Sequence, residues 1–421
     1  INETPVALPT SATGFEDNDI LVTLKTTDLN GLTYTITQNP AHGTLSGSAP
    51  NLTYTPSKDY FGADYFIYKV SDGIITSITA KASISVVPVN DAPAFTLIND
   101  TVTVLEDAPV HFINNFATDI SKGALNERSQ GLRFTLENNN PSLFRIQPYM
   151  TILGRLVFMP AKDANGTATI TVKLKDTGGT ANDGVDETTD EFTIEVLPVN
   201  DMPTIRIGRS LIVNEDCDPQ TFVGWATGIT PGPANESDQS VEMVLSTSND
   251  SLFATLPSIN PNDGTLTFEL AENANGYANV FVYVQDDGGI DNGGKDRTPV
   301  KTFRITIRAV NDPPSFGIVR ELIELPKADT SIKNYQIIRN ISSGPTNEFA
   351  QIIIFQVLNN TNMSMFYIQP RVSPQGVLTF RGRGVAREVN LFIKAVDSGG
   401  AAFGGKNVYT NEIPVTIRFT E

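Results

Sequence analysis

Asparagine–aspartate pairs close to a proline are the residues of this chain best suited to binding a metal ion. One five-residue phrase occurs three times, always after a run of alternating hydrophobic residues: Val89-Asn90-Asp91-Ala92-Pro93, Val199-Asn200-Asp201-Met202-Pro203 and Val310-Asn311-Asp312-Pro313-Pro314. An amide and a carboxylate side by side offer two oxygen ligands, and the proline stiffens the connector. The phrase therefore suggests a metal-bound linker. A plain turn, in which the aspartate caps its own backbone before the proline, is the alternative.

The spacing of the phrase predicts how the chain is divided. The intervals from Asp91 to Asp201, from Asp201 to Asp312 and from Asp312 to the last residue are equal to within two positions. A fixed period makes one repeat the unit of architecture, and a chain of 421 residues is too long for a single core. We therefore expect four modules, at residues 1–91, 92–201, 202–312 and 313–421.

Each module contains a segment that ends in an aspartate and has apolar residues two, four and six positions before it. In the second module Ile170, Val172 and Leu174 precede Asp176, and the corresponding aspartates elsewhere are Asp72, Asp286 and Asp397. A period of two indicates a half-buried strand. Glycine follows one or two positions later in every module, so each aspartate is expected where strand becomes loop.

A second alternating segment then runs to the end of each module, so the last two strands should form a hairpin. Its apolar residues are Ala82, Ile84 and Val86; Phe192, Ile194 and Val196; Phe303, Ile305 and Ile307; and Ile413, Val415 and Ile417. About seven short strands per module, separated by turn signals, indicate an all-β fold of immunoglobulin-like β-sandwiches. Module one has Pro40-Ala41-His42-Gly43-Thr44-Leu45 where the others share Phe-x-x-x-Pro, so it is a divergent subtype.

With these strands and linkers placed, the chain resembles the cadherin-like and bacterial immunoglobulin-like tandem repeats of large secreted adhesins and surface proteins. The resemblance rests on the repeated Val-Asn-Asp-x-Pro phrase and covers all four modules. It implies four tandem immunoglobulin/cadherin-like β-sandwich modules in an elongated array. In cadherin-like folds Ca²⁺ sits between modules, held by a glutamate of the first strand, the linker Asn-Asp pair and loop aspartates of the next module.

The resemblance implies a candidate set of Ca²⁺ ligands at each junction. These are Glu3, Asn90, Asp91, Asp119 and Asp176 at the first, Glu106, Asn200, Asp201 and Asp286 at the second, and Glu215, Asn311, Asp312 and Asp397 at the third. Gly228 stands where module two has Asp119, so the second junction should lack one ligand. Module four has Pro326-Lys327 where module two has Glu106-Asp107, so it has lost the glutamate.

The distribution of charge along the chain limits the classes of partner that it can bind. After Asp312 there are 11 Lys and Arg against 8 Asp and Glu, which leaves 19 against 39 in the first three modules. Acidic modules argue against nucleic acid or an anionic membrane as partner, and abundant extracellular Ca²⁺ would neutralise them.

Cys217 is the only cysteine, so no disulfide framework holds the modules. No apolar run approaches the length of a membrane span.

These observations predict a non-enzymatic extracellular stalk or adhesion segment that Ca²⁺ stiffens at its linkers. No nucleophile elbow, P-loop or zinc motif indicates catalysis. The expected partners are other copies of the chain or neighbouring repeats of a longer one, with a cell-surface protein or glycan left open. Nine Asn-x-Ser/Thr sequons permit glycosylation without establishing it.

The alternative is a structural subunit of an extracellular filament or matrix. In that case the acidic modules one to three meet the basic module four of a neighbour, head to tail. The basic docking face would be formed by Arg371, Arg381, Arg383 and Arg387.

Overall fold

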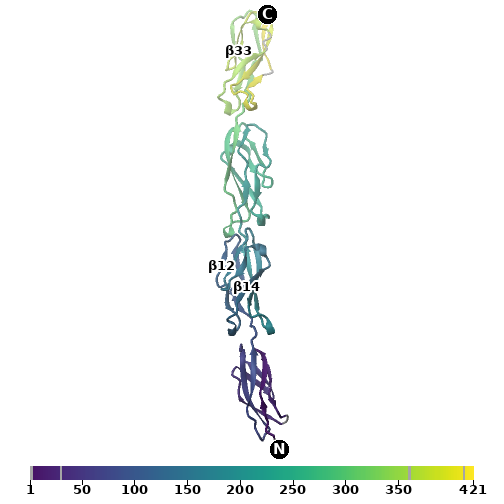
Figure 1. Ribbon diagram of the computed structural model, residues 1–421. Helices are drawn as coiled ribbons and strands as arrows, with labels where there is room; N and C mark the ends of the chain where they lie inside the picture. Colours follow the sequence, from purple (N-terminus) through teal and green to yellow (C-terminus); the bar gives the residue numbers. More distant parts are fainter. Residues whose placement is uncertain (1–2, 29–30, 359–361, 411–412) are drawn as a thin grey trace. The chain divides into compact units, whose positions relative to one another are not determined.

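The structure, a computed structural model, describes residues 3–28, 31–358, 362–410 and 413–421, and it is all-β apart from short 3-10 helices. Its contacts divide the chain into two units, Ile1–Val199 and Asn200–Glu421. Each unit contains two groups of strands, and the sequence colours of Figure 1 distinguish the four groups. We call the groups β1–β9 and β10–β18 repeats 1 and 2, and β19–β27 and β28–β37 repeats 3 and 4.

The strands of the first unit alternate with tight turns. In repeat 1 they are β1 (Ala7–Leu8), β2 (Thr10–Phe15), β3 (Ile20–Thr23), β4 (Lys25–Thr26), β5 (Thr33–Gln38), β6 (Gly43–Ser48), β7 (Asn51–Pro56), β8 (Gly62–Ser71) and β9 (Ala80–Val87). In repeat 2 they are β10 (Ala94–Leu97), β11 (Thr101–Leu105), β12 (His111–Ile113), β13 (Ala117–Ser121), β14 (Leu132–Asn138), β15 (Phe144–Met150), β16 (Leu156–Pro160), β17 (Gly166–Asp176) and β18 (Glu187–Leu197). The 3-10 helices are η1 (Leu125–Glu127), η2 (Pro141–Leu143) and η3 (Ala181–Asp183).

The second unit repeats this order. Repeat 3 consists of β19 (Thr204–Arg206), β20 (Leu211–Asn214), β21 (Gln220–Phe222), β22 (Thr227–Thr230), β23 (Val241–Thr247), β24 (Phe253–Ile259), β25 (Leu266–Leu270), β26 (Gly276–Asp286) and β27 (Lys301–Arg308). Repeat 4 consists of β28 (Ser315–Ile318), β29 (Leu322–Pro326), β30 (Ile332–Gln336), β31 (Ile338–Ser342), β32 (Ile354–Leu358), β33 (Phe366–Val372), β34 (Val377–Gly382), β35 (Glu388–Val396), β36 (Val408–Thr410) and β37 (Val415–Thr420). The 3-10 helices are η4 (Ala234–Glu236), η5 (Asp250–Leu252), η6 (Asp291–Gly293), η7 (Thr346–Glu348), η8 (Met363–Met365) and η9 (Ala402–Gly404).

The four repeats share one sheet topology, except that in repeat 4 the short strand β36 also pairs with β35. The larger sheets have the orders β2-β9-β8-β5, β11-β18-β17-β14, β20-β27-β26-β23 and β29-β37-β35-β32, and each is accompanied by a three-stranded sheet and a two-stranded pair. The first strand of the larger sheet runs parallel to the last strand of its repeat, whereas the last two long strands are antiparallel, as the hairpin prediction requires. The parallel pair brings the residue after the first strand beside the start of the linker.

Alternation along the long strands builds a separate hydrophobic core in each repeat. On β17 the residues Ile170, Val172 and Leu174 are all 0 % exposed, which confirms the predicted inward face. Their counterparts on β8, β26 and β35 are equally buried. Burying each such side chain contributes roughly 1.5–3 kcal/mol, so these strands form a firm scaffold for the loops at their ends.

One predicted strand position is wrong. Ile413 was expected to face the core, but it lies before β37 and is 49 % exposed. Pro414 follows it and has no N–H to give to the sheet, so the strand begins only at Val415. In the described part of the chain, no helix has the length and apolar character needed to cross a membrane.

Candidate metal sites at the repeat linkers

A buried glutamate lies directly after the first strand of the larger sheet in repeats 1 to 3. In repeat 1 this residue is Glu16, whose backbone N–H donates to the carbonyl of Val87 at 3.0 Å. Its carboxylate accepts the N–H of Val89, in the linker, at 2.6 Å. Burying a charge is costly unless it is hydrogen-bonded, so this contact fixes the carboxylate at the linker. The same contact joins Glu106 to Val199 at 2.6 Å and Glu215 to Val310 at 2.6 Å.

The structure puts Glu16, and not Glu3, in the position that the resemblance gave to the glutamate of the first junction. Glu3 is exposed and precedes β1, so it is not brought to the linker. The signal that would have found Glu16 is a Glu-Asp pair after the strand. It occurs as Glu16-Asp17, Glu106-Asp107 and Glu215-Asp216.

Three aspartates converge at the first linker, which comprises residues 88–93. Carboxylate oxygens of Asp17, Asp59 and Asp91 all lie within 4.8 Å of one another. The backbone N–H of Asp59 donates to Asp17 Oδ1 at 3.0 Å, which holds the two loops together. Both residues have left-handed backbone, with φ of 56° and 57°, a conformation that Asp and Asn tolerate better than most residues. Equivalent hydrogen bonds join Asp163 to Asp107 at 3.0 Å and Asn273 to Asp216 at 2.9 Å.

A further glutamate, missed by sequence reasoning, approaches the linker aspartate from the next repeat. Glu127 on η1 is 6 % exposed, and its Oε1 accepts the backbone N–H of Asp91 at 3.0 Å. Burial, followed by the charges of Glu127, Asp59 and Asp17, raises the pKa of Asp91, and Lys58 opposes these effects. Like charges thus face one another at this linker.

The buried Glu16 is subject to the same repulsion. Burial raises the pKa of Glu16, and the charges of Asp17, Asp91 and Glu127 raise it further, against the hydrogen bond from Val89. At the third linker, residues 309–314, burial and then the charges of neighbouring carboxylates raise the pKa of Asp312 and of Glu348. Both linkers therefore concentrate negative charge in a partly desolvated place.

The missed glutamate belongs to a motif, Asn-Glu-x-x-Gln, that recurs once in each of repeats 2 to 4. Its copies are Asn126-Glu127 with Gln130, Asn235-Glu236 with Gln239, and Asn347-Glu348 with Gln351. In the first copy Asn126 donates to Glu16 Oε2 at 3.3 Å, which links repeat 2 to the glutamate of repeat 1. The fixed position of this motif within the repeat is the sequence signal that could have revealed it.

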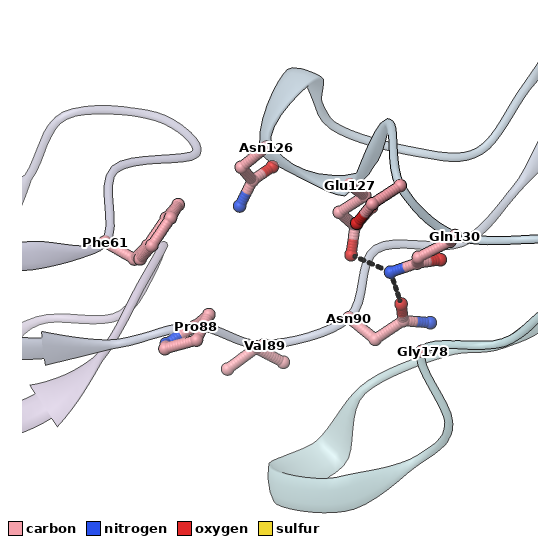
Figure 2. Close-up of a pocket in the computed structure, with 9 residues that line it drawn as sticks. Phe61, Pro88, Val89, Asn90, Asn126, Glu127, Gln130 and Gly178 are labelled. Atoms are coloured by element: carbon pink, nitrogen blue, oxygen red, sulfur yellow. Dashed lines mark hydrogen bonds between the residues drawn. The ribbon is translucent and has the colours of Figure 1, made fainter.

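The linker asparagine and the loop aspartate are brought together, but by a direct hydrogen bond. Asn90 Nδ2 donates to Asp176 Oδ1 at 3.0 Å and to the carbonyl of Val185 at 2.7 Å. Its Oδ1 accepts a hydrogen bond from Gln130 at 2.7 Å, as Figure 2 shows. Gly178 lies against this amide, and a Cβ there would come within 1.6 Å of Asn90 Oδ1. Asn90 therefore acts as a brace between the linker and the loops of repeat 2.

The same brace recurs at the other two linkers. Asn200 donates to Asp286 at 2.9 Å and accepts from Gln239 at 2.9 Å, and Asn311 donates to Asp397 at 3.1 Å and accepts from Gln351 at 2.7 Å. The linker aspartates follow the first pattern too: the N–H of Asp201 donates to Glu236 at 2.9 Å and that of Asp312 to Glu348 at 3.1 Å. Of the expected ligands, Asp91 and Asp312 lie near other carboxylates of their own unit, whereas the asparagines mainly hold loops.

Asp119 lies elsewhere. It is an exposed residue within β13, its carboxylate accepts the Thr118 hydroxyl at 3.3 Å, and it is not among the described carboxylates close enough to share an ion. Its φ is 50°, and the equivalent Gly228 and Asn340 have φ of 60° and 53°. Left-handed backbone is the shared requirement at this position. Glycine can therefore replace aspartate at this position in repeat 3 because both residue types tolerate left-handed backbone.

Several buried side-chain oxygens at the linkers accept no hydrogen bond from protein, and they suit a divalent cation. In the described part of the first linker region, Asp91 Oδ2, Asn126 Oδ1 and Gln130 Oε1 are buried and accept no hydrogen bond from protein. At the third linker the same holds for Asp312 Oδ2 and Gln351 Oε1. Buried acceptors without donors are rare in folded proteins. Ca²⁺ takes six to eight oxygen ligands from carboxylates, amides and carbonyls in flexible geometry, so these residues suit it.

The parallel closure of each sandwich, its repetition along the chain and the acidic linkers define a tandem array of immunoglobulin-like and cadherin-like repeats. More particularly, residues 2–85 and 90–189 each match the family model of the bacterial Ig domain.

Solved structures align with this chain at low sequence identity. Protocadherin gamma B2 extracellular cadherin domains 1-5 align with 16 % identity over 99 % of this chain and 81 % of that chain, with a TM-score of 0.50. Mouse cadherin-23 EC22-24 aligns with 17 % identity over 73 % of this chain and 100 % of that chain, with a TM-score of 0.40. Comparison with curated protein sequences gives no match.

Proposed function

We propose that this chain is a stalk or adhesion segment of an extracellular protein, in which Ca²⁺ bound at the linkers fixes the orientation of neighbouring repeats. The observation that supports this most strongly is the convergence of Asp17, Asp59 and Asp91 at one linker, with buried oxygens around them that have no donor. The ligands at the first linker would be these aspartates together with Glu16 and Glu127. At the third linker they would be Glu215, Asp216, Asp312 and Glu348.

A bound cation would act through the repulsion that the carboxylates otherwise exert. Glu16, Asp17 and Asp59 belong to repeat 1, Glu127 belongs to repeat 2, and Asp91 lies on the linker between them. An ion shared by these groups has its full set of ligands only when the two repeats are correctly oriented. Binding to the folded arrangement stabilises it by mass action, so extracellular Ca²⁺ would stiffen the linker.

Titration calorimetry of the full chain should detect Ca²⁺ binding with dissociation constants of about 1 mM or below, as for other extracellular modules. Addition of a chelator should lower the melting temperature and broaden the scattering-derived size distribution. Mg²⁺ should be a poor substitute because it demands a near-octahedral set of ligands. Absence of binding heat, together with identical melting and scattering in Ca²⁺ and chelator, would refute the proposal.

A specific surface of repeat 4 favours filament assembly as a second candidate function. The guanidinium groups of Arg381 and Arg383 lie 5.3 Å and 5.0 Å from the ring of Tyr367, which is 58 % exposed. Arg371 is exposed on the neighbouring strand β33. Since the residues after Asp312 carry 11 basic against 8 acidic groups, this face complements the acidic repeats of a second copy.

Sedimentation velocity tests the filament candidate. At low ionic strength the chain should form concentration-dependent oligomers, which salt disperses because exposed charges are screened. The double substitution Arg381→Glu and Arg383→Glu should abolish the oligomers. Arg133→Glu, a charge reversal at an exposed site of repeat 2, should leave them in place. A chain that sediments as a monomer under all these conditions is not a filament subunit.

A further inference from the structure

The tip of the η9 loop in repeat 4 carries an unusual residue for its backbone conformation. Phe403 has φ of 56° and is 58 % exposed. The same loop position in repeats 2 and 3 is occupied by Asn182 and Asn292, with φ of 58° and 56°. Asparagine tolerates left-handed backbone, but a bulky aromatic residue adopts it rarely and at a cost in free energy. Phe403 therefore needs compensating contacts.

Those contacts come from repeat 3. The guanidinium of Arg308 lies 4.8 Å from the centroid of the Phe403 ring, within the range of a cation–π interaction. The side chain of Asn214 donates from Nδ2 to the carbonyl oxygen of Phe403 at 3.4 Å. Asn214 and Arg308 end the strands β20 and β27 and are direct partners in the parallel pair. A loop of repeat 4 is thus seated on the end of the repeat 3 sheet.

The first linker lacks the residues for such a contact. The positions that correspond to Asn214 and Arg308 are Phe15 and Val87, which form the matching parallel pair in repeat 1. Neither side chain offers a cation or a hydrogen-bond donor, and the loop opposite carries Asn182 in place of phenylalanine. The Phe403 side chain and its basic and amide partners therefore occur together at the third linker.

The buried glutamate at the third linker is also better supplied with neutral donors. Glu215 Oε2 accepts hydrogen bonds from Asn275 at 2.9 Å and from Asn347 at 3.4 Å, besides the Val310 N–H bond to Oε1 at 2.6 Å. In repeat 1 the position of Asn275 is occupied by Phe61, which can donate nothing to Glu16. Amide donors stabilise a carboxylate without a cation, so Glu215 depends less on metal than Glu16 does.

We propose that the third linker holds its orientation without metal, through a clasp formed by Phe403, Arg308 and Asn214, whereas the first linker depends on Ca²⁺. The clasp involves none of the carboxylates at Asp312, so it persists while their repulsion is unrelieved. Removing Ca²⁺ would then loosen repeats 1 and 2 and leave repeats 3 and 4 as one stiff piece. Only the comparison with the first linker rests on the proposed function.

Distance distributions between spin labels test the clasp in the full chain. With Cys217 replaced by serine, one label pair at Ser46 and Thr135 reports on repeats 1 and 2, and another at Thr302 and Gln356 reports on repeats 3 and 4. All four are exposed strand positions. Chelation should broaden the first distribution and leave the second unchanged.

The substitution Phe403→Asn restores the residue type of repeats 2 and 3 and fits the same backbone. In chelator it should broaden the distribution across the third linker to the width seen across the first. Phe349→Asn, at a residue of the same repeat that is 83 % exposed, is the matched control and should change nothing. The clasp is overturned if the wild-type third linker broadens on chelation as much as the first, or if Phe403→Asn leaves it unchanged. If instead the first linker ignores chelator, the calcium proposal fails and the clasp is still judged by Phe403→Asn.

Discussion

Replacing Asp91 by asparagine is expected to raise the melting temperature of the metal-free protein and to remove most of the stabilisation that Ca²⁺ gives at the first linker. The substitution keeps the size of the side chain and the backbone N–H bond to Glu127. It removes the Asp91 carboxylate, whose pKa is raised by burial and by the charges of Glu127, Asp59 and Asp17. Without metal this relieves repulsion, but with metal it deletes a charged ligand. The sign of the effect therefore reverses between the two conditions.

The loss in Ca²⁺ should be large. An ion present at 100 times its dissociation constant stabilises the folded state by about 2.7 kcal/mol, which corresponds to a shift on the order of 10 °C for a repeat of this size. Differential scanning calorimetry in Ca²⁺ and in chelator measures both effects, and titration calorimetry should show fewer ions bound. Asp119→Asn is the matched control, because Asp119 is exposed and outside the cluster. An Asp91→Asn protein that melts below wild type in chelator would contradict the repulsion at this linker.

The strands and the asparagine–aspartate partners could be predicted because both follow from local pattern and a fixed period. Alternation alone placed Ile170, Val172 and Leu174 on the inner face of β17. Asn90 and Asp176 lie 86 residues apart and bond to each other, and the two later pairs have the same separation. In a repeat protein a shared spacing is sufficient to bring such residues together.

The rest of the site depends on pairing and backbone conformation that no local pattern reveals. Glu16 reaches the linker only because β2 runs parallel to β9, which lies at the opposite end of the repeat in sequence. Sequence reasoning, which cannot see that pairing, selected Glu3 instead. Asp119 was expected as a ligand, although its left-handed backbone is what repeat 2 shares with repeats 3 and 4. Which atom of Asn90 faces which partner is decided by the hydrogen-bond network around it.

Stability should depend on pH in opposite directions with and without Ca²⁺. In the metal-free protein Glu16, Asp91, Asp312 and Glu348 have raised pKa values, chiefly because of burial. A folded state that binds protons more tightly than the unfolded chain loses stability as pH rises from the ordinary pKa through the raised one. In chelator, lowering the pH from neutral toward the ordinary pKa values of these groups, 4.5 for Glu and 3.8 for Asp, should therefore raise the melting temperature. With Ca²⁺ bound, protons compete with the ion for the same oxygens, and the melting temperature should fall.

Other titrating groups can be separated from this effect. Burial lowers the pKa of His111, so this residue destabilises the fold as the pH falls through the ordinary histidine pKa of 6.5. This effect is the same in Ca²⁺ and in chelator. Hydrogen bonds lower the pKa of Asp64 despite its burial, and its contribution is lost only below the ordinary value of 3.8. Subtracting the melting temperature in chelator from that in Ca²⁺ cancels the contributions of His111 and Asp64. That difference should shrink steadily toward acid in wild type and be smaller at every pH in Asp91→Asn. A difference that stays constant with pH would show that the ion, if bound, does not sit on these carboxylates.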